Sequence, residues 1–154
     1  MFGKKQSSGG GSPRKLVEDS RFSMTSADPW ADRTSYYLEG PEEDGIKHGI
    51  MVNIEEKIEA PDAGAYARGR LKELSNDLAA YQELQQGPVQ LKGRESAYEV
   101  LYKWVPPGKR EILQRMMFVV SKGRALTLTA TFSEKTFRRL GKEVERVFRS
   151  FATL

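Results

Sequence analysis

His48 is the only histidine in the 154-residue chain, and the sequence contains no cysteine. A Ser-His-Asp triad would need His48 beside a serine and a carboxylate, and nothing near it in the sequence suggests one. Thiolate metal sites, cysteine nucleophiles and histidine-rich metal sites are excluded by composition. We therefore expect a protein that is not an enzyme, with no catalytic residue, cofactor or metal. His48 is interpreted as an exposed or partly buried strand residue.

Two short segments have compositions that occur in ion-binding or phosphate-binding loops. Residues 41–45, with the sequence PEEDG, form an acidic run that could hold a cation. The run lacks the alternating oxygen donors and the distal glutamate of an EF-hand, so a solvated hairpin turn explains it better. The three glycines at residues 9–11 have no strand before them and no helix after them, which excludes a phosphate-binding loop.

The last predicted helix carries six basic residues on its non-apolar faces: Lys135, Arg138, Arg139, Lys142, Arg146 and Arg149. They could bind phosphate groups or an acidic partner. Alternatively they form a solvated face, because three glutamates lie among them. The charge balance favours a solvated face. Four of the 25 basic residues lie in the first fifteen positions, which leaves 21 to balance the 21 acidic residues.

The segment of residues 112–120 is apolar on both faces of the strand it predicts. One face can pack against helices, and the other must meet a second layer, a dimer mate or an apolar ligand. The adjacent Met116 and Met117 suit an adaptable apolar surface. A strand that is wholly buried within one chain is the competing interpretation.

Two segments have helical period. Residues 62–81 place five apolar side chains on one face, with Asp62 as the candidate N-cap: Ala67, Leu71, Leu74, Leu78 and Tyr81. Residues 133–151 carry a second apolar stripe, with Ser133 as the candidate N-cap and a capping box of Thr131 with Glu134 as the alternative.

The other segments alternate with a period of two and predict strands at residues 33–39, 49–58, 88–92, 95–105, 111–120 and 124–132. In the last strand, Leu126, Leu128, Ala130 and Phe132 face one way, and three threonines face the other. The last hairpin is expected to turn at Lys122 and Gly123. Neighbouring strands with short turns predict an α+β fold, an antiparallel sheet of about six strands flanked by two main helices.

Residues 1–15 are rich in Gly, Ser and Lys and are expected to form a flexible tail. Residues 16–154 are expected to form a single domain. No stretch approaches the roughly 18 apolar residues of a membrane span, and the N-terminus lacks the apolar core of a secretory signal. A cytoplasmic protein is therefore expected.

Several short motifs in a fixed order are similar to those of one known family. The first half contains FSM at 22–24, DPWADRT at 28–34, the strand at 50–54 and Tyr66 at the head of a helix. The second half contains LKGR at 91–94, YKW at 102–104, QRMMF at 114–118 and LTLTAT at 126–131. Over about residues 20–152 the chain resembles the DcrB-like family.

The resemblance implies a fold related to PsbP and to the Mog-type Ran-binding proteins. The family includes the exported lipoprotein DcrB and the cytoplasmic Eag chaperones of type VI secretion. Eag proteins shield the N-terminal transmembrane helices of effectors in an apolar groove on the sheet, commonly as dimers. Without an export signal, the chain is expected to be an Eag-like chaperone or adaptor. Its expected partners are the hydrophobic helices of a secreted effector and a second copy of itself, without nucleic acid or membrane insertion.

By position, the resemblance implies five partner-binding residues: Tyr37, Arg70, Gln114, Met116 and Phe118. The chain departs from the family at two of them, because Eag proteins often have glutamine where this chain has Arg70 and Met116. This departure bears on the expected class of client more than on the expected fold.

Two other functions remain open. The chain could be a non-catalytic accessory domain of a larger assembly that binds a folded partner through the sheet edge or the basic helix. It could also bind nucleic acid through the tail and the last helix. Salt separates these alternatives, because groove binding survives high salt and phosphate binding weakens steeply.

Overall fold

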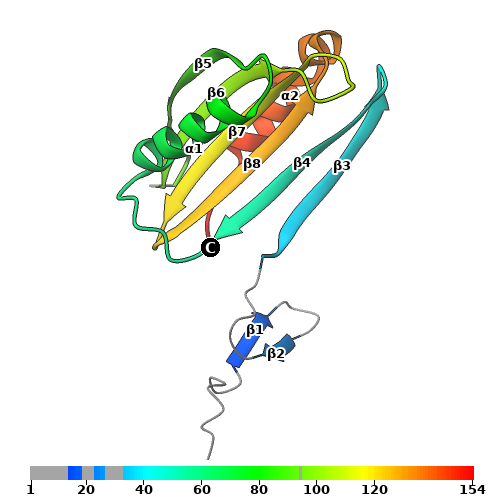
Figure 1. Cartoon of the computed structure of the whole chain (residues 1–154). Helices are drawn as coiled ribbons and strands as arrows, with labels where there is room; N and C mark the ends of the chain where they lie inside the picture. The colour runs from blue at the N-terminus through cyan, green and yellow to red at the C-terminus, as the bar shows by residue number, and fades with distance from the viewer. Residues whose placement is uncertain (1–13, 19–22, 27–32, 94) are drawn as a thin grey trace, which may run out of the picture. The chain divides into compact units, whose positions relative to one another are not determined.

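The computed structural model describes residues 14–18, 23–26, 33–93 and 95–154 (Figure 1). The chain divides into two compact units, Met1–Thr34 and Ser35–Leu154. In the first unit, β1 (Arg14–Glu18) pairs antiparallel with β2 (Ser23–Ser26). Most of the expected tail and the DPWAD motif lie outside the described residues, although the last two residues assigned to the tail, Arg14 and Lys15, belong to β1.

The second unit contains a six-stranded antiparallel sheet with the strand order β3-β4-β8-β7-β6-β5. The strands are β3 (Ser35–Glu43), β4 (Ile46–Glu55), β5 (Gln82–Val89), β6 (Ser96–Trp104), β7 (Ile112–Ser121) and β8 (Arg124–Phe132). With helices α1 (Ala63–Asp77) and α2 (Glu134–Arg149), the sheet confirms the predicted α+β fold.

Two hairpins turn on pairs of residues with positive φ. Lys122 and Gly123 have φ of 50° and 72°, which confirms the predicted turn between β7 and β8. Between β3 and β4 the pair is Asp44 and Gly45, with φ of 53° and 69°. A two-residue turn of this kind matches the twist of the flanking strands. The acidic turn is therefore shorter than predicted, and residues 41–43 belong to β3.

Both helices begin where the capping residues predict. Asp62 caps α1 by accepting a 2.8 Å hydrogen bond from the Ala65 amide. Ser133 caps α2 and forms its capping box with Thr136, so the alternative box of Thr131 with Glu134 does not form. However, α1 ends at Asp77 because Leu78 is already extended, with φ of −91° and ψ of 126°. The next strand, β5, consequently begins six residues before the predicted position.

The helices cover opposite faces of the sheet, as Figure 1 shows. Helix α1 packs on β5, β6 and β7, and this side of the sheet is called the α1 face. Helix α2 packs on β7 and β8 on the other side, called the α2 face. Strand β7 is therefore covered on both faces within one chain, which favours the interpretation of a strand buried within the monomer, although Ile112, Gln114 and Val120 remain half-buried.

On the α1 face, strands β3 and β4 lie beyond the strands that α1 covers (Figure 1). They form one side of the sheet, with β3 at its edge. Within the described residues, none of the helices combines the length and the apolar character needed to cross a bilayer.

Candidate partner-binding surface

A single cross-strand row on the α1 face runs from beneath α1 to the free edge of the sheet. Its members, each paired with the next, are Val100, Met116, Thr129, Met51 and Tyr37. Met116 is only 8% exposed, whereas Met51 is 41% and Tyr37 51% exposed. The row therefore begins in the core and ends in solvent.

The exposed end of this row belongs to a larger patch over β8, β4 and β3, which is called the open surface. Its residues alternate with those that point to the α2 face, and they are Tyr37, Met51, Asn53, Thr129 and Thr131. The patch combines two large apolar side chains with hydroxyl and amide groups. It can therefore contact an apolar segment and also hydrogen-bond to a polar position in that segment.

Gly49 determines how Tyr37 lies on the open surface. A β-carbon at Gly49 would overlap the phenol ring and hydroxyl of Tyr37. The Tyr37 side chain therefore lies across β4 above the glycine instead of standing away from the sheet. This position places the aromatic ring on the same face as Met51, its cross-strand partner.

Tyr66 and Arg70 of α1 border the open surface. The Tyr66 hydroxyl donates a 2.6 Å hydrogen bond to Glu55 on β4, and its ring packs edge-on against Phe118 at 5.8 Å. Burial, followed by this bond to Glu55, raises the pKa of Tyr66 to about 12, and the Arg70 charge opposes the rise. Arg70 lies one turn further along the same side of α1. Its exposed guanidinium pairs with Glu73 at 2.9 Å.

Gln114 lies at the boundary between the covered and open parts of the α1 face. Its carbonyl oxygen accepts hydrogen bonds from the Tyr102 hydroxyl at 2.7 Å and the Trp104 indole at 2.8 Å. Its amide nitrogen donates to the Thr131 hydroxyl at 3.0 Å. Both ends of the Gln114 amide are thus held internally, and Thr131 is the member of this network that belongs to the open surface.

The five residues implied by the resemblance all lie on β3, β7 or α1, but they are not equally accessible. Tyr37 and Arg70 are exposed, and Gln114 is half-buried. Met116 and Phe118 lie beneath α1 in a core cluster with Ala67 and Leu71, and Phe118 is fully buried. Neither side chain is on the surface in this arrangement, because the small residues of α1 let the helix pack closely on β7.

Met51, Thr129 and Thr131 are surface residues that the resemblance did not point to. The signal for them is the alternation of β4 and β8, which places Met51 and the threonines of β8 on the side opposite the apolar residues. The sequence could not show that this side stays open, because that depends on where α1 packs.

A separate apolar cleft of about 350 Å³ lies on the α2 face, between α2 and the β3–β4 hairpin. Its buried lining includes Ile50, Phe132 and Leu140, while Leu38 and Val147 are exposed at 55% and 42%. The cleft therefore has an apolar interior and an apolar rim next to the edge strand.

His48 also lines this cleft and is buried, which corrects its interpretation as an exposed or partly buried residue. Its Nδ1 lies 2.9 Å from the Pro41 carbonyl oxygen, and its Nε2 lies 2.9 Å from the Thr136 hydroxyl. The imidazole therefore connects the β3–β4 hairpin to the first turn of α2.

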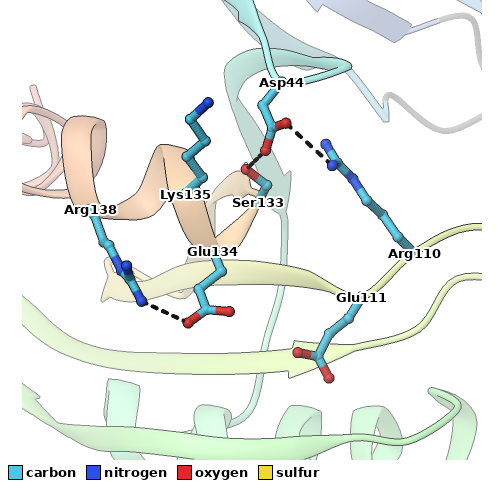
Figure 2. A pocket seen from close by; sticks show the side chains of 7 residues that line it. All are labelled: Asp44, Arg110, Glu111, Ser133, Glu134, Lys135 and Arg138. Carbon is cyan, nitrogen blue, oxygen red and sulfur yellow. Dashed lines mark hydrogen bonds and ion pairs between the residues drawn. The ribbon is translucent and has the colours of Figure 1, made fainter.

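Figure 2 shows a polar pocket of about 400 Å³ beside the same turn of α2. Ser133 donates a 2.6 Å hydrogen bond to Asp44, and Arg110 approaches the other Asp44 oxygen at 3.4 Å. The Ser133 bond, followed by the Arg110 charge, holds the pKa of Asp44 below its usual range. Asp44 and Arg110 are therefore paired with each other, and the bond between Asp44 and Ser133 links the β3–β4 hairpin to the start of α2.

The profile of the DcrB family matches residues 23–150. The comparison with curated proteins found no match. Among solved structures, the chain is similar to a Pseudomonas aeruginosa protein of unknown function, PA94, described as a putative regulator. The identity is 13% and the TM-score 0.75, over 94% of this chain and 99% of that one.

Two further structures support the same fold. LpqN of Mycobacterium tuberculosis, described as involved in cell envelope biogenesis, has 19% identity and a TM-score of 0.50 over 86% of this chain and 73% of that one. The cyanobacterial PsbP of Synechocystis has 12% identity and a TM-score of 0.51, over 90% of this chain and 91% of that one. The fold is therefore PsbP-like.

Proposed function

Because this chain belongs to the DcrB family, we propose that it is a non-catalytic adaptor that binds an apolar segment of another protein. In its specific form, the proposal is a cytoplasmic Eag-like chaperone that shields the N-terminal transmembrane helices of a type VI secretion effector. The observation that carries the proposal is the open surface, where Tyr37 and Met51 are about half exposed beside the uncovered threonines of β8.

The chemistry of the open surface suits a membrane-spanning helix better than a folded polar partner. Met51 is flexible and polarizable, so it can adapt to different apolar side chains. Thr129, Thr131 and Asn53 can hydrogen-bond to the serine, threonine or small polar residues that such helices carry. Arg70 can lay its aliphatic stem along an apolar client while its guanidinium stays with Glu73 in solvent.

The energetics indicate that the open surface of one chain is a weak site. Burying about 500 Å² of apolar area, at about 25 cal/mol per Å², contributes roughly 12 kcal/mol. Association costs about 4–15 kcal/mol in lost freedom of motion, so little net affinity remains. A client helix would therefore need a second apolar surface, which a second copy of the chain could supply.

The proposal is tested by co-expressing the full chain with a soluble carrier protein that bears one 20-residue apolar helix at its N-terminus. We expect the wild-type chain to keep the carrier soluble and to copurify with it. Met51→Asp should reduce the captured fraction at least about tenfold, because a charge in the contact is expensive to desolvate.

Leu84→Asp is the matched control, because Leu84 is also a large exposed apolar residue but lies on β5, at the opposite edge of the sheet. It should leave capture unchanged. The proposal is wrong if the wild-type chain does not capture the helix, or if Met51→Asp captures it as well as the wild type does in a folded protein.

A second candidate function is an accessory domain that binds an acidic partner through α2. Lys135, Lys142 and Arg146 form no ion pair within the described part of the chain, and Arg138 lies between them on the same face of the helix. Binding through these cations to an acidic protein, or to nucleic acid, would be lost at about 1 M salt. Capture by the open surface would survive that salt concentration, so the same copurification separates the two functions.

A further inference from the structure

A second polar cavity, of about 410 Å³, lies beside the last turns of α2. Its charged lining consists of four basic residues and a single carboxylate: Lys92, Lys142, Arg146, Arg149 and Glu145. Lys92 comes from the segment between β5 and β6, and the other four residues belong to α2. Basic side chains from two separate parts of the chain therefore converge on one cavity.

The carboxylate of this lining is already shared by two arginines. Glu145 lies 3.4 Å from Arg149 and 3.7 Å from the buried Arg115. The same two arginines contact Glu99, at 3.0 Å and 3.5 Å. Nε and Nη1 of Arg115 still have no hydrogen-bond partner among the described residues. The two carboxylates are therefore fully engaged by the two arginines, and neither is left to neutralise a further cation.

The other three cations of the cavity are Lys92, Lys142 and Arg146, and none of them has an ion-pair partner in the part of the chain that the structure describes. Lys142 precedes Arg146 by four residues, a spacing at which like charges repel each other on a helix. The negative end of the α2 dipole favours cations in the last turn, but it does not account for Lys92 on a different element. The cavity therefore holds three positive charges that the described chain leaves without a counter-charge.

We propose that this cavity binds a small soluble ligand that carries two linked phosphate groups. One phosphate group carries about 1.5 to 2 negative charges near pH 7, and two linked groups carry about three, which matches the three unpaired cations. Arg146 can donate two parallel hydrogen bonds to one phosphate, and Lys92 and Lys142 can act as point charges. The inference goes beyond the proposed function, because the cavity shares no residue with the open surface.

Isothermal titration calorimetry of the full chain with inorganic pyrophosphate, in a buffer of low ionic strength, tests the site. We expect pyrophosphate to bind at least about tenfold more tightly than monophosphate or sulfate, because the second phosphate adds charge-assisted hydrogen bonds. A chain that does not bind pyrophosphate, or that binds the three anions with equal affinity, overturns the proposal.

Lys142→Gln and Lys135→Gln are a matched pair of variants. Both lysines are exposed on α2 and lack an ion pair among the described residues, but only Lys142 lines this cavity. Lys142→Gln and Lys92→Gln should each weaken pyrophosphate binding at least about fivefold, and Lys135→Gln should leave it within about twofold. Equal losses in Lys142→Gln and Lys135→Gln, or unchanged binding in Lys92→Gln, would show that anions bind along α2 instead of in the cavity.

Competition experiments separate a soluble diphosphate from larger polyanions. Phosphatidylglycerol vesicles and a short single-stranded DNA present single phosphate groups, on a surface and along a chain. At matched phosphate concentrations we expect neither of them to displace pyrophosphate. If the vesicles or the DNA displace it, and Lys92→Gln and Lys142→Gln weaken their binding, the ligand of this cavity is a larger polyanion and the proposal is overturned.

Discussion

Met116 and Tyr37 lie in the same cross-strand row of the sheet, separated by Thr129 and Met51, although α1 buries one and solvent surrounds the other. Only the part of the row that α1 leaves uncovered can therefore form a surface for a partner. The covered end of the row stabilises the fold, and the uncovered end is available to a partner. This division predicts different outcomes for substitutions on the same face.

The first prediction concerns Gly49, which provides the space for the Tyr37 ring. In Gly49→Ala the new methyl group displaces an exposed side chain that can rotate away. We therefore expect the free energy of unfolding to stay within about 1 kcal/mol of the wild-type value, since alanine is also favoured over glycine in a strand. Capture of the helix-bearing carrier should fall at least about threefold, because the methyl group displaces the Tyr37 ring from its position over β4.

Gly87→Ala controls for the change of residue, because a β-carbon at Gly87 of β5 meets no atom within 4 Å. Capture should be unaffected in that variant. If Gly49→Ala captures the carrier as well as Gly87→Ala does, the position of Tyr37 over β4 has no part in binding.

The second prediction concerns the covered end of the face. Phe118 is fully buried beneath α1, so Phe118→Ala should lower the free energy of unfolding by about 3–5 kcal/mol. Met51→Ala, on the exposed part of the same face, should lower it by less than about 1 kcal/mol. Urea denaturation followed by circular dichroism measures both. Equal losses would mean that α1 does not cover Phe118 in solution.

Alternation along the strands predicted the faces of the sheet correctly. In β8, Leu128, Ala130 and Phe132 point to the α2 core and the threonines to the other face, as the sequence indicated. Strand β5 was misplaced because its sequence is polar on both faces, so no alternation marks it. The end of α1 was misplaced because Leu78 and Tyr81 continue the helical spacing. Both pack on the core from outside the helix, and Tyr81 lies 5.2 Å from Tyr102 between ring centroids.

The sequence predicted strands that carry the candidate site on one sheet, but it did not predict which of these side chains are exposed. Sequence order placed Tyr37, Gln114, Met116 and Phe118 on strands of one sheet, and the structure brings them to one face. Whether each side chain is open depends on the position of α1 over β5, β6 and β7, which no local pattern determines. The internal role of Gln114 depends equally on Trp104 and Thr131, which are distant in sequence.

The third prediction concerns the buried Arg115, which packs between β7 and α2. Its Nη1 lies 3.5 Å from Glu99 and 3.7 Å from Glu145, and the guanidinium lies over the Phe137 ring. Removing the carboxylate in Glu99→Leu would leave Arg115 with only the more distant Glu145. We therefore expect the free energy of unfolding to fall by about 3 kcal/mol, as measured by thermal or chemical denaturation.

Arg115→Met should be tolerated far better, because Glu99 keeps its 3.0 Å contact with Arg149. We expect a change within about 1 kcal/mol, since a well-packed apolar side chain can replace a buried charge at little cost. A larger loss in Arg115→Met than in Glu99→Leu would contradict this account of the ion-pair cluster.

The fourth prediction concerns the acid stability of the contact between Asp44 and Ser133. The hydrogen bond from Ser133, followed by the Arg110 charge, lowers the pKa of Asp44 in the folded chain. A lowered folded pKa means that the contribution of Asp44 to stability is present above its unfolded pKa, about 3.9, and is lost as the pH falls through the folded value. Asp44→Asn should therefore lower the melting temperature at pH 7.

At about pH 2.5 the same substitution should have a smaller effect, because protonation of the wild-type carboxyl approaches the neutral state that asparagine imposes. Melting temperatures of the two proteins at several pH values between 7 and 2.5 measure the convergence. Glu59→Gln is the control, because Glu59 is exposed and takes part in no hydrogen bond or ion pair among the described residues. A difference between Asp44→Asn and the wild type that stays constant across this range would mean that the charge of Asp44 does not stabilise the junction of the hairpin with α2.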